Sequence, residues 1–188
     1  MPASKEYHTY VTEIWYSIIG DITLDTVRDL VSWINGRVYE NPIKLLKLFL
    51  SSEGGDVESA LMIHHYIKAL PFEVEIVAFN KIGSAANIIF VSSPKRSAVK
   101  ECIFVLHEGT NTINNNTASL HQHEDSLLWM KDRVNRHVEV ISRETGKDKE
   151  EIEKAMAETV FLSVEQAKEF GLVKEVLEKL PISQVAVR

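Results

Sequence analysis

A turn of small residues between two apolar runs is the first stretch of this sequence that could do chemistry. Residues 74–79 have the apolar pattern of a buried strand and residues 85–91 that of a core helix, with Gly83 and Ser84 between them. Small side chains at such a turn let another group approach the backbone closely. The first N–H groups of the helix have no partner inside it and can face an anion. The pattern predicts an oxyanion site, which a neighbouring nucleophile would complete.

Four sequence blocks, which include this turn, resemble blocks of the ClpP family of serine peptidases. Residues 83–87, Gly-Ser-Ala-Ala-Asn, resemble the family's Gly-x-Ala-Ala-Ser turn, and residues 51–55 resemble its Asn-Ser-Pro-Gly-Gly block. Residues 104–108 resemble its apolar strand that ends in His-Gln, and residues 161–173 resemble its Phe-Leu-Ser ending. The blocks follow the family's order, and the resemblance covers roughly residues 18–178.

The resemblance implies a fold and an assembly. The expected fold is α/β of the ClpP/crotonase type, with repeated β-β-α (βαβ) units and a long handle-type helix. One domain is expected over residues 1–188, with 1–10 and 181–188 as disordered tails. The family forms homo-oligomeric rings, as two stacked heptamers, which act on peptides or unfolded proteins. It also docks to an ATPase unfoldase through a longer N-terminal segment than this sequence has, so the sequence does not by itself predict that partner.

The resemblance also assigns the positions of a Ser-His-Asp triad and of an oxyanion hole. The nucleophile position is Asn87, the general base is His107 and the acid position is Thr159, while the backbone N–H groups of Gly55 and Ile88 would form the oxyanion hole. A carboxamide cannot be activated by imidazole, and a threonine carries no charge to stabilise imidazolium. The sequence therefore predicts a ClpP-like subunit that is inactive or degenerate as written.

Ser84 is an alternative nucleophile. It is the only nearby hydroxyl that could replace the missing serine, and it lies three residues before Asn87, in the turn. For it to act, the backbone would have to differ from that of the family, because geometry precedes chemistry in assigning a nucleophile.

Two other functions remain open. One is a non-catalytic peptide-binding or assembly subunit, which would keep the groove and the oligomer without chemistry. The other is an acyl-CoA enzyme of the crotonase type, which shares the fold and the oxyanion logic, although the sequence has no acyl-CoA signature. Peptide hydrolysis separates a peptidase from a binding subunit, and acyl-CoA binding would favour the third reading.

Composition restricts the partners. The formal charge is −6 over 188 residues with no cluster of Lys and Arg, which argues against nucleic acid. There is no apolar run of membrane-spanning length and no secretory signal, and Cys102 is alone, which together favour a cytoplasmic protein. His121 and His123 are two apart on an expected helix and do not face each other, so neither a metal nor another cofactor is predicted.

The expected elements alternate between strands and helices. Thr23 is expected to cap the first helix and Gly36 to end it. Residues 94–96 are expected to form a surface loop. Residues 109–117 are polar and read equally well as an extended edge that pairs with a peptide or as a loose loop. The expected strands are 11–19, 43–50, 74–79 and 101–106, and the expected long helix is 120–143.

Overall fold

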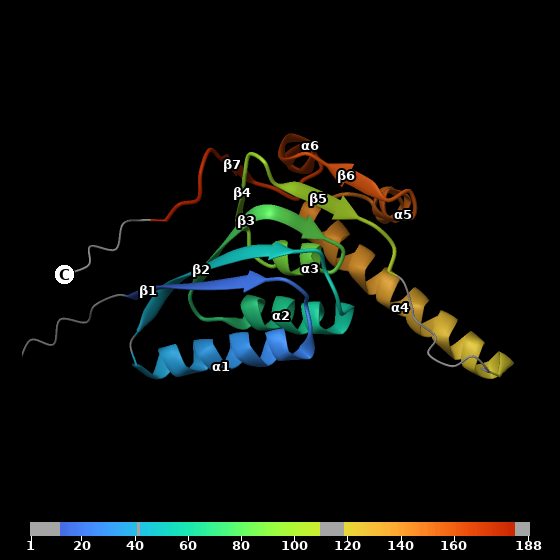
Figure 1. The fold of residues 1–188 in the computed structure, drawn as a ribbon, viewed down its shortest axis with the longest axis horizontal. Coiled ribbons are helices and arrows are strands. Elements are labelled where there is room, and N and C mark those ends of the chain that lie inside the picture. The colour runs from blue at the N-terminus through green and yellow to red at the C-terminus, as the bar shows by residue number, and fades with distance from the viewer. Residues whose placement is uncertain (1–11, 41, 110–118, 183–188) are drawn as a thin grey trace, which may run out of the picture.

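The structure is a computed structural model, and it describes residues 12–40, 42–109 and 119–182. Strands and helices alternate along most of the chain (Figure 1). They are β1 (Thr12–Ile19), α1 (Leu24–Glu40), β2 (Ile43–Ser52), α2 (Val57–Ala69), β3 (Glu73–Gly83), α3 (Ala86–Phe90), β4 (Lys95–Val99), β5 (Ile103–Leu106), α4 (Leu120–Thr145), α5 (Lys149–Ala157), β6 (Val160–Leu162), α6 (Val164–Glu169) and β7 (Glu175–Leu177).

The described strands form one sheet, in the order β1-β2-β3-β4-β7, and every pair along this path is parallel. β2 and β3 are apolar on both faces over much of their length, as strands covered by other elements must be. The sheet therefore confirms the α/β class that the alternating apolar runs predict.

β3 changes partners along its length. Residues 75–78 pair with β4, whereas residues 81–83 pair with β5, which in turn holds β6 antiparallel. Asn80 lies between the two halves with a φ of 73°. The polar residues after Phe79 thus belong to a strand that continues to Gly83, four residues beyond the predicted strand end. This continuation brings the turn after β3 beside the end of β5.

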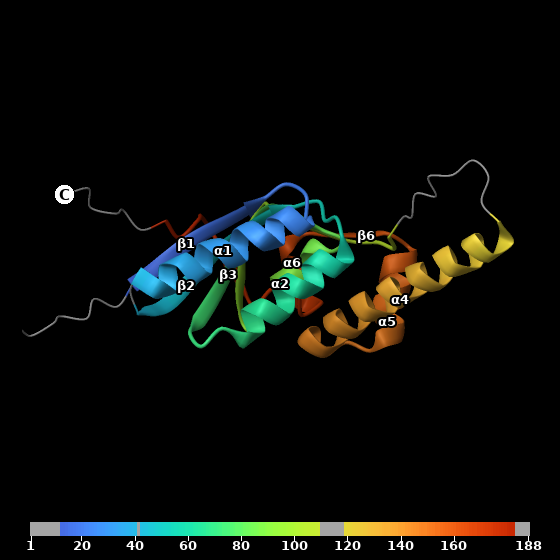
Figure 2. The same ribbon diagram turned by 90° about the horizontal axis from the view of Figure 1, so that it is seen from below.

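Helices α1 and α2 lie side by side under β1, β2 and β3, as Figure 2 shows from below. Their apolar faces close the core against the sheet. Thr23 caps α1 as predicted, because its hydroxyl accepts from the Thr26 N–H at 3.3 Å.

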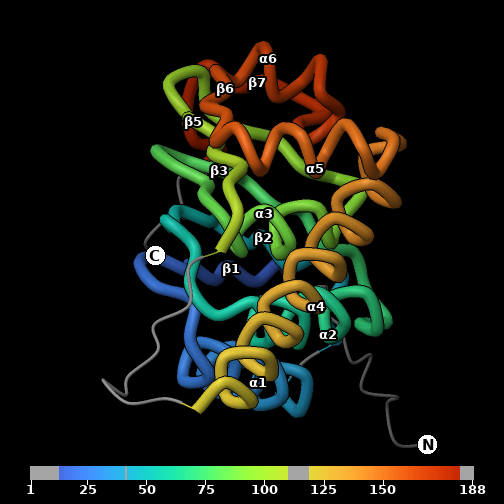
Figure 3. The backbone as a smooth tube through the Cα atoms, turned by 90° about the vertical axis from the view of Figure 1, so that its right-hand side faces the viewer, coloured from blue at the N-terminus to red at the C-terminus, as the bar shows by residue number. Residues whose placement is uncertain are grey.

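Helix α4 packs against α2, α3 and α5, and its N-terminal half extends away from the sheet (Figures 1 and 2). Figure 3 is seen from this side, with α4 in front of α2 and α3. Only the second half of α4 is buried, at His137, Val138, Val140 and Ile141. The first half exposes large apolar side chains, namely Leu120, Leu127, Leu128 and Trp129. The predicted long helix is confirmed, and Leu127 in its first half is exposed and does not face the core of this chain.

The predicted end of the first helix is wrong. Gly36 does not end α1, which continues to Glu40, where Arg37 bonds Glu40 at 3.0 Å and stacks over Trp33. A glycine inside a helix costs only about 1 kcal/mol, which such contacts can offset.

The predicted surface loop at residues 94–96 is also wrong, because β4 begins at Lys95 and pairs with both β3 and β7. Arg96 is buried, which a charged residue tolerates only where its donors find acceptors. The residues expected to form tails lie largely outside the described part, as do residues 110–117 of the predicted polar segment.

Candidate functional site

Asn87, at the expected nucleophile position, faces the interior. Its side chain is fully buried, and its Nδ2 donates to the carbonyl oxygens of Val105 at 2.9 Å and Ser84 at 3.1 Å. Its Oδ1 has no hydrogen-bond partner in the described part of the chain. The amide therefore ties the first turn of α3 to β5, and it lines neither of the two hollows described next.

Two hollows meet at His107. One, of about 230 Å³, lies between the turn after β2, Ser84 and the buried half of α4, and we call it the α4 hollow. The other, of about 210 Å³, is lined by Lys81, Gly83, Val105, Thr159 and Phe161, and we call it the Thr159 hollow. Glu53 and His107 contribute to both walls. Each hollow has the size of a peptide side chain rather than of a whole cofactor.

His107 follows the last residue of β5, so that its ring lies between the two hollows. Its Nδ1 lies 2.6 Å from the carbonyl oxygen of Glu108. A carbonyl only accepts, so Nδ1 carries the proton in this contact and Nε2 holds the lone pair of the neutral ring. This is the tautomer that a general base needs.

Thr159 does not orient His107. The residue follows α5 with a φ of 54°, and its side chain is exposed at the edge of the Thr159 hollow. The Nδ1 of His107, which a triad would direct at this position, is bonded to Glu108 instead. The contact that the acid position of a triad would make with His107 is made here by the backbone carbonyl of the neighbouring residue.

Of the two expected oxyanion donors, one is engaged elsewhere. The Ile88 N–H donates to the Ala85 carbonyl at 3.1 Å, which closes the first turn of α3. Gly55 lines the α4 hollow and has a φ of 140°. A Cβ at this position would lie 2.4 Å from the Ile22 carbonyl oxygen, so the close approach requires glycine.

Ser84, unlike Asn87, reaches a hollow. It lines the α4 hollow together with His107, and its φ of 48° is unusual for a residue with a Cβ. Its N–H donates to the Val105 carbonyl at 3.0 Å, which holds the turn against β5. A strained serine that shares a hollow with a histidine is an arrangement seen at nucleophile positions.

His137 is the site residue that the sequence analysis missed. It lies on α4 and lines the α4 hollow with only 2% of its surface exposed, and its Nε2 has no hydrogen-bond partner among the described residues. Burial, with the nearby His107, lowers the pKa of His137 to about 4. His137 shares one helical face with the apolar residues 134, 138 and 141. The sequence pattern therefore reads as an apolar face and gives no sign of a site residue there.

The low pKa of His137 predicts that stability falls with acid. Unfolded histidine binds a proton near pH 6.5 and the folded residue only near pH 4, so the unfolded state holds more protons between these values. Between pH 7 and 4.5 this group alone should remove about 2–3 kcal/mol from the free energy of unfolding. Urea unfolding at both pH values should show that extra loss in the parent chain and not in His137→Leu. Equal losses in both proteins would contradict the buried neutral histidine.

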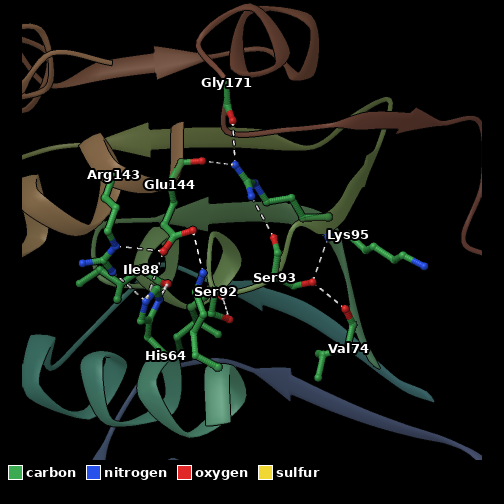
Figure 4. Close-up of polar contacts among 12 residues, drawn as sticks. His64, Val74, Ile88, Ser92, Ser93, Lys95, Arg143, Glu144 and Gly171 are labelled. Atoms are coloured by element: carbon green, nitrogen blue, oxygen red, sulfur yellow. Dashed lines mark hydrogen bonds and ion pairs between the residues drawn. The ribbon is translucent and has the colours of Figure 1, made fainter. Parts of the chain in front are cut away.

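A second buried histidine supports α3 from behind, as Figure 4 shows. His64 on α2 contacts the Ile88 carbonyl through Nδ1 at 3.0 Å, and its Nε2 lies 3.2 Å from Nη2 of Arg143. The guanidinium can only donate, so Nε2 accepts and Nδ1 donates, and burial lowers the pKa of His64. Glu144, held by Lys68 at 2.9 Å, completes this network. It ties the helix that carries Asn87 to the end of α4.

Cys102 and His121 line neither hollow. Burial raises the pKa of the Cys102 thiol to about 12, as expected for a core residue. His121 is exposed and lies 3.6 Å from Asp125. No set of three or more His, Cys, Asp or Glu residues among those described could hold a metal ion. None of the described helices is long and apolar enough to cross a membrane.

The chain is similar to known proteins over most of its length. Residues 8–180 match the family model described as Clp protease. The "ATP-dependent Clp protease proteolytic subunit 3" of Rhizobium johnstonii is 28% identical over 134 residues, which are 70% of this chain and 68% of that protein.

A solved structure of a ClpP1 point mutant from Listeria monocytogenes superposes with a TM-score of 0.73 and 24% identity over 88% of this chain and 92% of that one. This likeness shows the ClpP/crotonase-like fold. The family match covers residues 8–180, which is far more than half of the sequence. The chain belongs to the Clp protease family.

Proposed function

We propose that this chain is a peptide-binding subunit of a ClpP-type assembly. In this proposal Asn87 does not act as a nucleophile, so the subunit does not hydrolyse peptides by way of that residue. One observation carries the proposal. The Asn87 side chain is fully buried and donates to Val105 and Ser84, so it reaches neither hollow beside His107. A neutral carboxamide in that place can neither attack a carbonyl nor give a proton to imidazole.

The rest of the catalytic unit supports the same proposal. His107 keeps the tautomer of a base, but the group that would stabilise its protonated form is an exposed, uncharged threonine at position 159. The backbone N–H of Ile88, the other expected oxyanion donor, donates a hydrogen bond within the first turn of α3 instead. The two hollows on either side of His107 nevertheless have the size of side chains, which favours retention of a peptide or an unfolded segment.

The assembly that we propose is a homo-oligomeric ring, built as two stacked heptamers. The exposed apolar side chains on the first half of α4, including Leu128 and Trp129, favour burial against another copy. The similar Rhizobium johnstonii protein is named an ATP-dependent proteolytic subunit. Partnership with an ATPase and a cytoplasmic location are parts of this proposal.

The test compares cleavage and binding on the purified oligomer. We expect the parent chain to hydrolyse a fluorogenic peptide and an unfolded protein no faster than His107→Ala does, while a labelled unfolded segment binds saturably. Asn87→Ser is the matched variant. A His107-dependent gain in rate there would mean that only the nucleophile is missing, and no gain would mean that binding alone remains. Hydrolysis by the parent chain that His107→Ala abolishes would overturn the proposal.

A second candidate function is hydrolysis with Ser84 as the nucleophile. It is favoured by one observation, that Ser84 and not Asn87 lines the α4 hollow with His107. In this case the parent chain cleaves, Ser84→Ala and His107→Ala each abolish cleavage, and Asn87→Ala does not. The removal of a nucleophile from such a unit costs several orders of magnitude in kcat.

A further inference from the structure

Two nitrogens on one face of α4 are buried in the wall of the α4 hollow without partners. They are Nε of Arg133 and Nε2 of His137, and neither has a hydrogen-bond partner among the described residues. The two residues are one helical turn apart, so their side chains lie next to each other. His137 is 2% exposed, which means that bulk water does not satisfy it.

Unpaired nitrogens of this kind indicate what the hollow lacks. A buried polar group without a partner costs free energy, and native proteins leave few of them. Nε of arginine is only a donor and always carries part of a positive charge, and the neutral histidine donates from Nε2 in one of its tautomers. A ligand oxygen that accepts from both would fill the gap, and an ionised carboxylate does so with the strongest hydrogen bonds.

The acidic residues of the same wall already have partners. Glu53 pairs with Lys81 at 2.7 Å. Asp56 accepts from the N–H and the hydroxyl of Ser59, at 2.8 and 2.7 Å, and so caps α2. Neither carboxylate is bonded to Arg133 or His137 within the described part of the chain, because each already has the partner named above.

The remaining wall is apolar. Val57, Met130, Val134 and Met156 line the hollow, which has a volume of about 230 Å³. A hollow whose wall combines apolar side chains with unpaired donors fits a side chain with methylene groups and a terminal acceptor. We propose that the α4 hollow binds a glutamate side chain of the bound peptide, with its carboxylate on Arg133 and His137. This inference rests on the peptide-binding function proposed above.

The test uses three host peptides that differ at one residue. Fluorescein-labelled peptides of Ala, Gly and Ser with a central Glu, Gln or Met have side chains of nearly equal length, and only Glu carries charge. We expect the oligomer to bind the Glu peptide about tenfold more tightly than the Gln or Met peptide in anisotropy titrations at fixed salt.

Substitutions in α4 test which residues cause the preference for the Glu peptide. Arg133→Met and His137→Leu should each reduce the preference for Glu to about twofold or less. The control is Arg136→Met, which removes the same charge from the same helix but at a residue that pairs with Asp132 and Glu58 and does not line the hollow. It should keep the full preference. Since Arg133 is only half-buried, its replacement tests the site even if His137→Leu folds poorly.

The outcomes separate this inference from the function on which it rests. If no peptide binds, the peptide-binding function fails and the inference with it. If all three peptides bind equally, or Gln equals Glu, the function stands and the carboxylate site is wrong. A preference for Glu that persists in both Arg133→Met and His137→Leu also overturns the site, because other residues must then bind the carboxylate.

Discussion

Replacement of Gly55 by alanine should lower the free energy of unfolding by about 3–5 kcal/mol. A Cβ on Gly55 would lie 2.4 Å from the carbonyl oxygen and 2.9 Å from the nitrogen of Ile22, and the φ of 140° is strained for alanine. Relief of that clash would break the hydrogen bonds by which Ile22 joins Gly54 and Asp56, both 2.8 Å long. These bonds hold the turn that forms one wall of the α4 hollow.

The chain offers a matched control at Gly36, which lies inside α1 with no atom within 4 Å of an added Cβ. Gly36→Ala should stabilise the protein by about 0.5–1 kcal/mol, because alanine loses less backbone entropy in a helix. Urea unfolding followed by circular dichroism, at one protomer concentration, measures both changes. A Gly55→Ala variant within about 1 kcal/mol of the parent would show that the turn is looser than the structure has it.

Arg96→Met should cost about 3–5 kcal/mol of stability. The buried guanidinium donates to the carbonyl oxygens of Ser93, Glu144, Gly171 and Leu172, at 2.9, 2.8, 3.0 and 2.5 Å. These carbonyls come from separate places in the chain, including the end of α4 and the turn after α6. Methionine fills a similar volume but leaves all of these acceptors without their donor.

Lys95→Met is the control for Arg96→Met, since it removes a positive charge one residue away. Lys95 is exposed and pairs with Glu73 at 2.6 Å, and a surface pair of this kind is worth about 0–1 kcal/mol. The free energies of unfolding of the two variants, measured by thermal or urea unfolding, should therefore differ by several kcal/mol. Similar losses in both would mean that Arg96 acts through general charge and not through its carbonyl contacts.

The order of strands and helices could be predicted from the sequence because the signals are local. Apolar runs at residues 43–50 and 74–79 give buried strands, and the spacing of Val134, Val138 and Ile141 gives the long helix. The cap at Thr23 depends on neighbours within a few residues, and the structure has it. That residue 87 is an asparagine, whose carboxamide cannot act as a nucleophile, is likewise evident from residue type alone.

β4 and the burial of Arg96 could not be predicted in this way. Residues 95–99 form a strand because β3 and β7 flank them, and those partners are distant in sequence. The charge at Arg96 indicates a surface, yet carbonyls from residues 93, 144, 171 and 172 converge on it. No local pattern encodes that convergence.

For the candidate site, too, the sequence determines some features and the tertiary structure determines others. Residue types at Asn87, His107 and Thr159 limit what chemistry is available, and that limit holds in any conformation. Which groups meet depends on the register of β3 against β5 and on the rotation of α4. Those long-range contacts turn Asn87 towards Val105, and they set His137 and Arg133 in one wall. Side-chain direction inside a packed core is a property of all its neighbours together, so it appears only once the chain is folded.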